Sequence, residues 1–349
     1  MMTNLSIPTQ MSIFSNPFFK TSHHMRTLII ATTFGIMLIQ SHFSKAVDFM
    51  YVTNTGSNLV SVYDTDGVLQ STIGSSATLN GPTGIVFDGS GNMFVASHYS
   101  NSISKFDSSG TYISSISANL NGPEGLAFDL MGNLYAANAR GDTISKFDRY
   151  GTYLSTISTN LSGPNGLAVD SNGHLYAANT GDNTISKFDS SGNFLATISS
   201  NLYGPTGLTF DSTGNLFASQ YHGNWISKFD TGDRFQIRLG SSASLSYAKG
   251  MAFDSSGNLY AASSNGYLSK FDPSGSQLYR IQSGFSTPNY IAFHDGLTST
   301  VPEPSSWILA GIGIIALGMT ANRKPVFITK GTRLIAPILF ATCTAQPQL

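Results

Sequence analysis

The sequence predicts an all-β fold in which four-stranded sheets repeat around a common axis, a β-propeller of six blades. Three observations support this prediction. The phrase GPxG begins at residues 81, 122, 163 and 204, so one unit returns every 41 residues. Each unit divides into four short strand-like segments separated by turn residues. Only 11% of the 349 residues are charged and 35 are glycine, which suits many short strands joined by polar turns.

The third unit shows the four expected strands most clearly. They are predicted at residues 166–170, 174–179, 184–189 and 194–199. The segments between them are rich in Asn, Asp, Ser and Gly, which supply the backbone geometry of tight turns. Four strands within a period near 41 residues are typical of one propeller blade.

The two ends of the repeat region are expected to share a blade. Five units begin at 81, 122, 163, 204 and 247, the last in the degenerate form YAKG. Residues 49–73 supply three strands that lack a first strand, and residues 290–294 supply a first strand with nothing after it. Joining them closes the ring as a split sixth blade. An open ring would expose apolar side chains, at about 1.5–3 kcal/mol for each large residue.

The repeated motif G-P-x-G-[LI]-[ATV]-[FV]-D-x-x-G-N-[LM]-[YF] resembles the NHL repeat family. The resemblance covers about residues 48–298, and the propeller domain is assigned to residues 47–298. It implies the propeller fold but no particular function, because this scaffold carries many functions.

The most regular residues are interpreted as scaffold. Apolar positions such as Leu126, Leu134 and Phe147 recur in the units and are expected to pack between sheets. The aspartates that end the first and third strands are expected to cap turns, since DSSGN offers too few carboxylates for a calcium loop. The repeated lysines are expected to be solvated residues of outer strands; they are Lys105, Lys146, Lys187, Lys228 and Lys270.

A ligand-binding site should be sought where the repeat varies. The segments that lead into the first strands share a face with the loops between the second and third strands. The x of GPxG should rim the channel there, at Thr83, Glu124, Asn165, Thr206, Lys249 and Asn289. Aromatic or imidazole groups should lie farther out, at His98, Tyr99, Tyr221, His222, Trp225 and Tyr267. A polar mouth with few charges suits a glycan or a protein ligand; variable solvated loops are the alternative interpretation.

An enzyme is the alternative function. Lactonase-like and lyase-like propellers place metal ligands at the channel mouth, but Glu124 is the one carboxylate in this ring. His98, His174, His222 and His294 belong to different blades, and His174 and His294 are expected at the far face. The sequence contains no nucleophile elbow, phosphate loop or HExxH motif. We therefore predict a binding or structural module with no catalytic residue, metal or cofactor, and keep a metal-dependent hydrolase or lyase as the alternative.

The first 46 residues are predicted to form a secretory signal peptide. Lys20 and Arg26 precede a 12-residue apolar run at 28–39, and a small-x-small cleavage site ends at Ala46. The run is shorter than the about 20 residues of a membrane-spanning helix. Met25 would begin a compact signal peptide by itself, and a buried core helix is the alternative interpretation.

Residues 299–324 resemble the PEP-CTERM sorting signal of exported bacterial proteins. The resemblance rests on a Pro-Glu-Pro triplet, an apolar run and a basic pair: Pro302, Glu303, Pro304, Arg323 and Lys324. It implies that a membrane helix at about 307–321 holds the protein at the inner membrane until an exosortase-type enzyme cleaves near the triplet. The protein would then reach the cell surface or an extracellular, exopolysaccharide-associated matrix. A permanent membrane anchor is the alternative interpretation.

The C-terminal tail, the net charge and the single cysteine restrict the possible sorting, partners and metal sites. Residues 325–349 form an atypical tail, because the family signal usually ends near its basic pair. The formal net charge of −1 gives no electrostatic reason to expect nucleic acid as a partner. Cys343 is the one cysteine, so neither an intrachain disulfide nor a cysteine-based metal site is expected.

Overall fold

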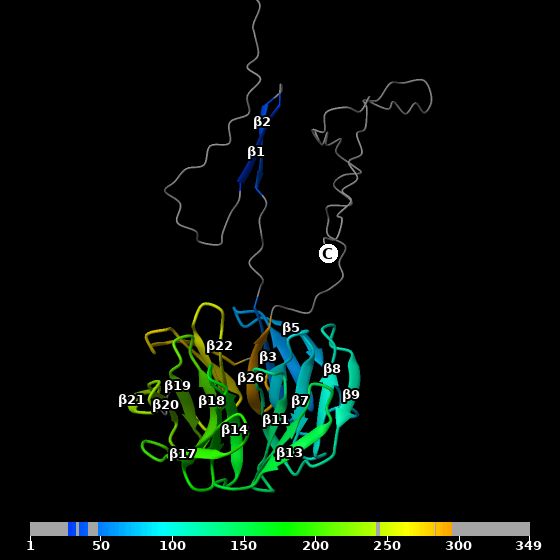
Figure 1. Cartoon of the computed structure of the whole chain (residues 1–349). Helices are drawn as coiled ribbons and strands as arrows, with labels where there is room; N and C mark the ends of the chain where they lie inside the picture. The colour runs from blue at the N-terminus through cyan, green and yellow to red at the C-terminus, as the bar shows by residue number, and fades with distance from the viewer. Residues whose placement is uncertain (1–26, 33–34, 41–47, 242–244, 283, 295–349) are drawn as a thin grey trace, which may run out of the picture. The chain divides into compact units, whose positions relative to one another are not determined.

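The computed structural model describes residues 27–32, 35–40, 48–241, 245–282 and 284–294 (Figure 1). The predicted signal cleavage site, the sorting segment 299–324 with its expected helix, and the tail 325–349 lie outside these residues. Within the predicted signal peptide, β1 (Thr27–Thr32) and β2 (Gly35–Gln40) pair antiparallel. Among the described residues there is no helix with the length and apolar character that a membrane crossing needs.

Six four-stranded antiparallel sheets form the blades. Blade 1 contains β26 (Pro288–His294), β3 (Phe49–Asn54), β4 (Leu59–Tyr63) and β5 (Leu69–Ile73). Blade 2 contains β6 (Pro82–Phe87), β7 (Met93–Ser97), β8 (Ser102–Phe106) and β9 (Tyr112–Ile116). Blade 3 contains β10 (Pro123–Phe128), β11 (Leu134–Asn138), β12 (Thr143–Phe147) and β13 (Tyr153–Ile157).

The last three blades follow the same order. Blade 4 contains β14 (Pro164–Val169), β15 (Leu175–Asn179), β16 (Thr184–Phe188) and β17 (Phe194–Ile198). Blade 5 contains β18 (Pro205–Phe210), β19 (Leu216–Gln220), β20 (Trp225–Phe229) and β21 (Phe235–Leu239). Blade 6 contains β22 (Ala248–Phe253), β23 (Leu259–Ser263), β24 (Tyr267–Phe271) and β25 (Gln277–Ile281).

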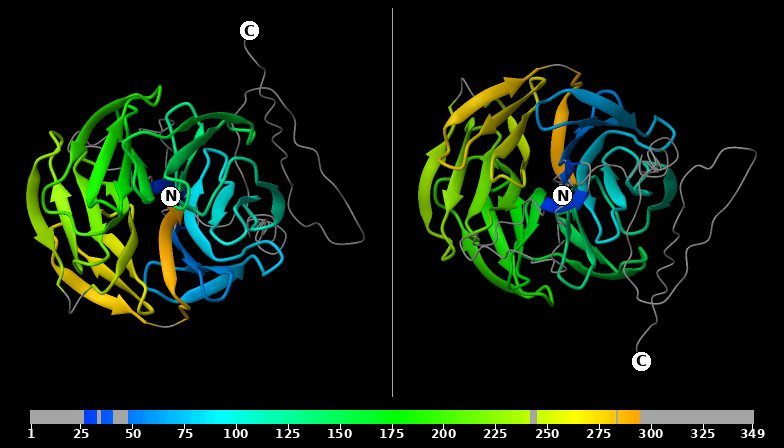
Figure 2. Two further views of the ribbon diagram at one scale, coloured as in Figure 1. Left: turned by 90° about the horizontal axis from the view of Figure 1, so that it is seen from below. Right: turned by 90° about the horizontal axis from the view of Figure 1, so that it is seen from above.

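The blades close into a ring, as the sequence predicts. The innermost strands contact one another in the order β6, β10, β14, β18, β22, β26 and back to β6, and the views along the axis show the blades around one centre (Figure 2). The split blade is confirmed: β26 pairs with β3 so that Ala292 faces Tyr51 and Phe293 faces Met50. One sheet therefore joins the two ends of the propeller.

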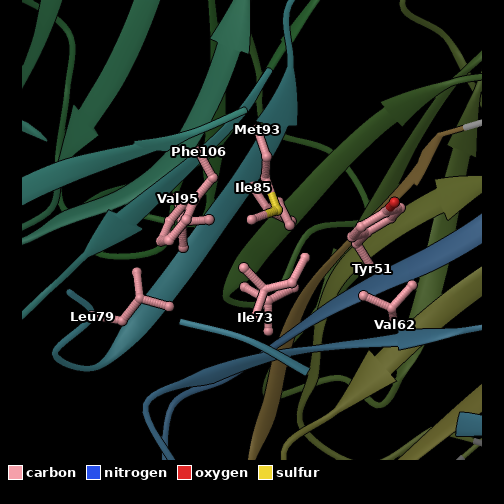
Figure 3. Packing of buried hydrophobic residues seen from close by; sticks show 9 residues of the cluster. Tyr51, Val62, Ile73, Leu79, Ile85, Met93, Val95 and Phe106 are labelled. Atoms are coloured by element: carbon pink, nitrogen blue, oxygen red, sulfur yellow. The ribbon is translucent and has the colours of Figure 1, made fainter. Parts of the chain in front are cut away.

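Apolar side chains fill the spaces between blades. At the joint between blades 1 and 2, Tyr51 and Val62 from one side meet Met93, Val95 and Phe106 from the other (Figure 3). These side chains are essentially buried. The alternation of the repeat is the cause, because the second and third strands of a blade carry apolar residues at the positions that face a neighbouring sheet.

Close backbone contact and amide caps hold neighbouring blades together at the axis. A Cβ on Gly125 would collide with the carbonyl oxygen of Asn165 on the next inner strand, which explains why the last residue of GPxG is glycine. Left-handed asparagines in the loops between the second and third strands add a cap. The Oδ1 of Asn183, for example, accepts the N–H of Gly204 in the next blade at 2.6 Å.

The aspartates close their turns as expected. Asp88 Oδ1 accepts the N–H groups of Ser90 and Asn92, each at 2.9 Å, and its Oδ2 accepts the Asn92 amide at 2.8 Å. The prediction of solvated lysines is wrong. Lys146 Nζ lies 3.2 Å from Asp129 Oδ2 and 4.9 Å from the ring centre of Tyr135. The cause is geometric, because the third strand lies beside the second and the lysine stem covers the aromatic ring.

Candidate functional site

The variable loops and the GPxG segments lie together on one face, which we call the mouth face. Backbone hydrogen bonds connect the two segments within a blade: in blade 2 Gly81 O accepts His98 N–H at 3.0 Å, and in blade 5 Gly204 O accepts Tyr221 N–H at 2.8 Å. The opposite side, built from the aspartate-closed turns, is called the turn face. Residues that differ from blade to blade on the mouth face are therefore anchored to a regular backbone.

The six x positions of GPxG divide into two groups. Thr83 and Thr206 are buried, and their hydroxyls donate to Pro123 O at 2.9 Å and Ala248 O at 2.8 Å in the next blade. These two threonines therefore connect blades. Glu124 and Asn289 are buried, while Asn165 and Lys249 are half-buried. Within the described residues, the polar side chains of these four do not form this kind of hydrogen bond to the backbone of the next blade.

Glu124 and His98 form a pair at the joint of blades 2 and 3. His98 Nδ1 lies 2.8 Å from Glu124 Oε1, and both side chains are largely shielded from water. Neither His98 Nδ1 nor Glu124 Oε2 has a well-formed hydrogen bond to the described residues, although both atoms are buried. The Oδ1 atom of Asn289 is also buried and has no hydrogen-bond partner among the described residues. A buried acceptor without a donor is unfavourable by about 1–3 kcal/mol, so a ligand hydroxyl or amide would relieve it.

Tyr290 crosses the channel. It occupies the position that is glycine in the other five blades, and its ring lies over Gly250 of blade 6. Its hydroxyl donates to Asn165 Oδ1 at 2.9 Å, which belongs to blade 4 on the opposite side of the ring. Burial, and then the negative charge of Glu124, raise the pKa of Tyr290 well above its ordinary value. The phenol therefore stays neutral, and its hydroxyl is bonded to a residue of the mouth ring.

A cluster of aromatic rings lies beside the mouth on blades 5 and 6. The ring centres of Tyr203 and His222 are 5.5 Å apart, those of Tyr221 and His222 are 5.1 Å apart, and those of Tyr221 and Tyr247 are 5.1 Å apart. Lys249 Nζ lies 5.1 Å from the centre of Tyr221. Tyr203, His222 and Tyr247 are exposed. This aromatic cluster, defined by these four rings, offers flat faces to solvent.

A smaller aromatic group stands on the other side, over blades 2 and 3. The rings of His98 and Tyr99 meet edge to face at 5.3 Å, and the Arg140 guanidinium lies 6.0 Å from the Tyr99 ring centre. Tyr99 is exposed. The Glu124–His98 pair is thus continuous with an outer aromatic surface.

Trp225 and Tyr267 interact within their own blades. Trp225 Nε1 donates to Ser227 Oγ at 3.1 Å, and the Arg238 guanidinium covers the indole at 4.1 Å from its ring centre. Arg280 lies 4.5 Å from the ring centre of Tyr267 in the same manner. An arginine therefore covers one face of each of these two rings.

Tyr203, Tyr247 and Tyr290 are site residues that the sequence reasoning did not select. Two of them interrupt the motif itself: Tyr247 stands where four blades carry the first glycine of GPxG, and Tyr290 stands where the other five carry the last. The x position alone does not carry that signal; the first and last positions of the motif do. A tyrosine in place of a motif glycine must direct a large side chain into space that the other blades leave to backbone.

The turn face is less uniform than the sequence suggested. A pocket of about 270 Å³ lies between blades 4 and 5, where Asp170, Asp211 and Asp233 line it with Tyr176 and Phe210. Asp233 replaces a turn glycine and accepts Lys187 Nζ at 3.0 Å and the Tyr176 hydroxyl at 3.1 Å. All three carboxylates of this pocket have cationic or imidazole partners in the protein.

The histidines that the structure describes in the propeller lie on both faces. His174 Nδ1 lies 2.9 Å from Asp170 Oδ2, and His294 stacks on Phe87 with ring centres 4.4 Å apart, both on the turn face as expected. Across the part of the chain that the structure describes, no three His, Cys, Asp or Glu side chains converge in a way that could hold a metal ion.

Comparisons with known proteins agree with this architecture. The NHL repeat family model matches residues 161–188, and the PEP-CTERM protein-sorting motif matches residues 300–324. No curated protein matches the chain. A chain of the nidogen/laminin complex has a TM-score of 0.62 at 19% identity and covers 70% of this chain and 98% of its own.

Two bacterial structures are also similar in fold. A protein of unknown function from Bacteroides caccae has a TM-score of 0.60 at 13% identity, covering 71% of this chain and 98% of its own. Virginiamycin B lyase from Staphylococcus aureus has a TM-score of 0.56 at 15% identity, covering 72% and 92%. Identities this low relate the folds alone.

Fold and repeat together define the class: a closed six-bladed β-propeller with a polar, aromatic-flanked mouth on one face. More specifically, residues 161–188 of this propeller match the NHL repeat model, and residues 300–324 match the PEP-CTERM protein-sorting motif. Such a motif implies export and membrane anchoring before processing.

Proposed function

We propose that this protein is an exported binding module whose mouth face takes a sugar residue of a surface or matrix polysaccharide. One observation carries the proposal: an exposed aromatic cluster stands beside a mouth in which the buried Glu124 Oε2 has no donor among the described residues. Flat aromatic faces pack against the C–H surface of a sugar ring, while the carboxylate and amide oxygens accept hydrogen bonds from its hydroxyl groups.

The mouth is better matched to a neutral ligand than to an ion. Glu124 already has the imidazole of His98 beside it, and Lys249 lies against Tyr221. The remaining polar groups, Asn165 and Asn289, are neutral amides. A sugar residue can satisfy the open acceptors without adding charge to a low-dielectric channel, whereas a charged ligand would lose its hydration there.

Binding should be tested on a glycan array with the purified protein and matched variants. His222→Ala and Glu124→Gln remove one aromatic face and the acceptor charge, and we expect each to weaken binding by about ten-fold or more. Trp225→Phe is the control, because its indole is already covered by Arg238. Glycan binding that is absent in the wild type, or equal in all variants, would remove the sugar proposal and leave a protein ligand to be tested by the same variants.

Sorting is proposed to place this module at the cell surface or in the matrix. An exosortase-type enzyme would cleave near Pro302–Pro304, with Arg323 and Lys324 left on the cytoplasmic side. Mass spectrometry of the mature protein tests this, since a C-terminus near Pro302 supports processing. A chain that still ends at Leu349 supports a permanent anchor instead.

A lyase or hydrolase at the same mouth is the second candidate, and the Glu124–His98 pair is the observation that favours it. A carboxylate 2.8 Å from an imidazole can hold and transfer a proton. Elemental analysis of the purified protein separates the candidates. Stoichiometric calcium or zinc that is lost in Glu124→Gln would favour the metal-dependent enzyme over the binding module.

A further inference from the structure

On the turn face of blade 3, two turns carry exposed large side chains, which together we call the blade 3 patch. We define it by Leu130 and Met131, in the turn between β10 and β11, and by Arg149 and Tyr150, in the turn between β12 and β13. Leu130 is 70% exposed, Met131 80% and Tyr150 83%. At the corresponding positions the other blades hold only Ser, Thr, Gly, Asn, Asp or Pro.

The fold does not require these side chains. The Met131 N–H donates to Asp129 Oδ1 at 3.0 Å and the Tyr150 N–H donates to Asp148 Oδ1 at 2.8 Å, as serine N–H groups do in other blades. The Arg149 guanidinium lies 5.6 Å from the Tyr150 ring centre, which holds a positive charge beside the exposed ring. Because these turn bonds use backbone N–H groups, they do not depend on the side chains of Met131 and Tyr150.

Both ends of the propeller lie on the same face as the patch. Asp48 Oδ2 accepts the N–H of Ser255, which stands in the turn between β22 and β23. At the other end, His294 packs on Phe87 beside the turn that contains Gly91. The chain therefore leaves the propeller from the turn face toward the sorting motif.

We propose that the blade 3 patch contacts the membrane interface while the sorting segment holds the protein there. Twelve residues, 295–306, separate β26 from the apolar run, and they reach at most about 40 Å when extended. Tyrosine favours the headgroup layer, leucine and methionine favour the acyl boundary, and arginine is attracted to anionic lipid. The mouth face then points away from the membrane.

Fluorescence quenching in reconstituted vesicles tests this contact. The full chain, with Cys343→Ser, is labelled with an environment-sensitive dye at Met131→Cys, at Thr213→Cys in the matching turn of blade 5, or at Ser100→Cys on the mouth face. The vesicles contain phosphatidylcholine, phosphatidylglycerol and a lipid with an acyl-chain nitroxide. We expect at least about three-fold stronger quenching at position 131 than at position 213, and the weakest quenching at position 100.

The matched variant restores the consensus of the repeat. Leu130→Ser with Tyr150→Ser should lower quenching at position 131 to the level of position 213, while circular dichroism stays unchanged. Equal quenching at all three positions, or no change in the serine variant, would overturn the proposal. A dimer in detergent that the serine variant dissociates would also overturn it, because the patch would then cover a second copy of the chain.

Discussion

At the scale of single residues, the mouth depends on a departure from the repeat. Five blades place glycine after the x of GPxG, and blade 1 places Tyr290 there. The glycines let inner strands approach so closely that a Cβ would collide with the next blade. Tyr290 avoids this by directing its ring into the channel, where Asn165 on the opposite blade accepts its hydroxyl.

Two substitutions at Tyr290 should distinguish the contribution of its hydrogen bond to stability from the contribution of its ring. Tyr290→Phe removes the bond to Asn165 and should lower the free energy of unfolding by about 1–3 kcal/mol, because the amide oxygen loses its donor. Tyr290→Gly restores the motif but empties the channel and should cost about 3–5 kcal/mol. Urea denaturation of both variants measures this. A glycine variant as stable as the wild type would show that the ring contributes nothing to closure.

At the scale of strands and turns, aspartates define where each hairpin ends. The hydrogen bond from the Ser109 hydroxyl lowers the pKa of Asp107, as the Ser274 hydroxyl lowers that of Asp272. The N–H groups two and four residues farther on add to the effect. The ionised form is therefore the one that the turns stabilise.

The pH dependence of unfolding follows from these turns. A carboxyl group with a lowered pKa in the folded state stabilises the fold above its unfolded pKa, near 4, and this contribution is lost as pH falls further. We expect the free energy of unfolding to be nearly constant between about pH 5 and 7 and to fall below about pH 4. Denaturant titrations across this range measure it. Asp107→Asn keeps the turn and should reduce the acid slope; an unchanged slope would contradict this account.

At the scale of the whole molecule, closure depends on β26. This strand adds Ile291 and Phe293 to the apolar contacts of blade 1 and completes the ring between β22 and β6. Without it, β3 would be an unpaired edge and the inner faces of blades 2 and 6 would be exposed to water.

Truncation should show how much closure contributes. A chain that stops after Thr287 loses the buried Ile291 and the half-buried rings of Tyr290 and Phe293. Full burial of a large side chain is worth about 1.5–3 kcal/mol, so this loss is a large part of the total stability of a typical domain. The control is a chain that stops after His294 and retains β26. Limited proteolysis and size-exclusion chromatography should show a compact, resistant control and a sensitive, expanded truncation. Equal resistance would mean that the ring does not need its split blade.

The sequence predicted the blades and their closure because those features are local or periodic. The GPxG spacing and the alternation within 184–189 determine strand pairing, and the missing strand at one end matched the extra strand at the other. It did not predict that Tyr290 reaches Asn165, since these residues are neighbours only across a closed ring. Nor did it predict the Lys146 contact with Tyr135, because the side-chain direction depends on how the third strand lies against the second.

The split blade also sets an order of events. A chain that is threaded through a membrane from its N-terminus delivers β3 first and β26 last. Until β26 is added, the chain forms an open arc of blades with an exposed apolar face at each end. The apolar run begins after only twelve further residues. If export proceeds in this direction, we expect closure of the ring and capture of the apolar run by the membrane to follow each other closely, so that a delay in one would delay the other.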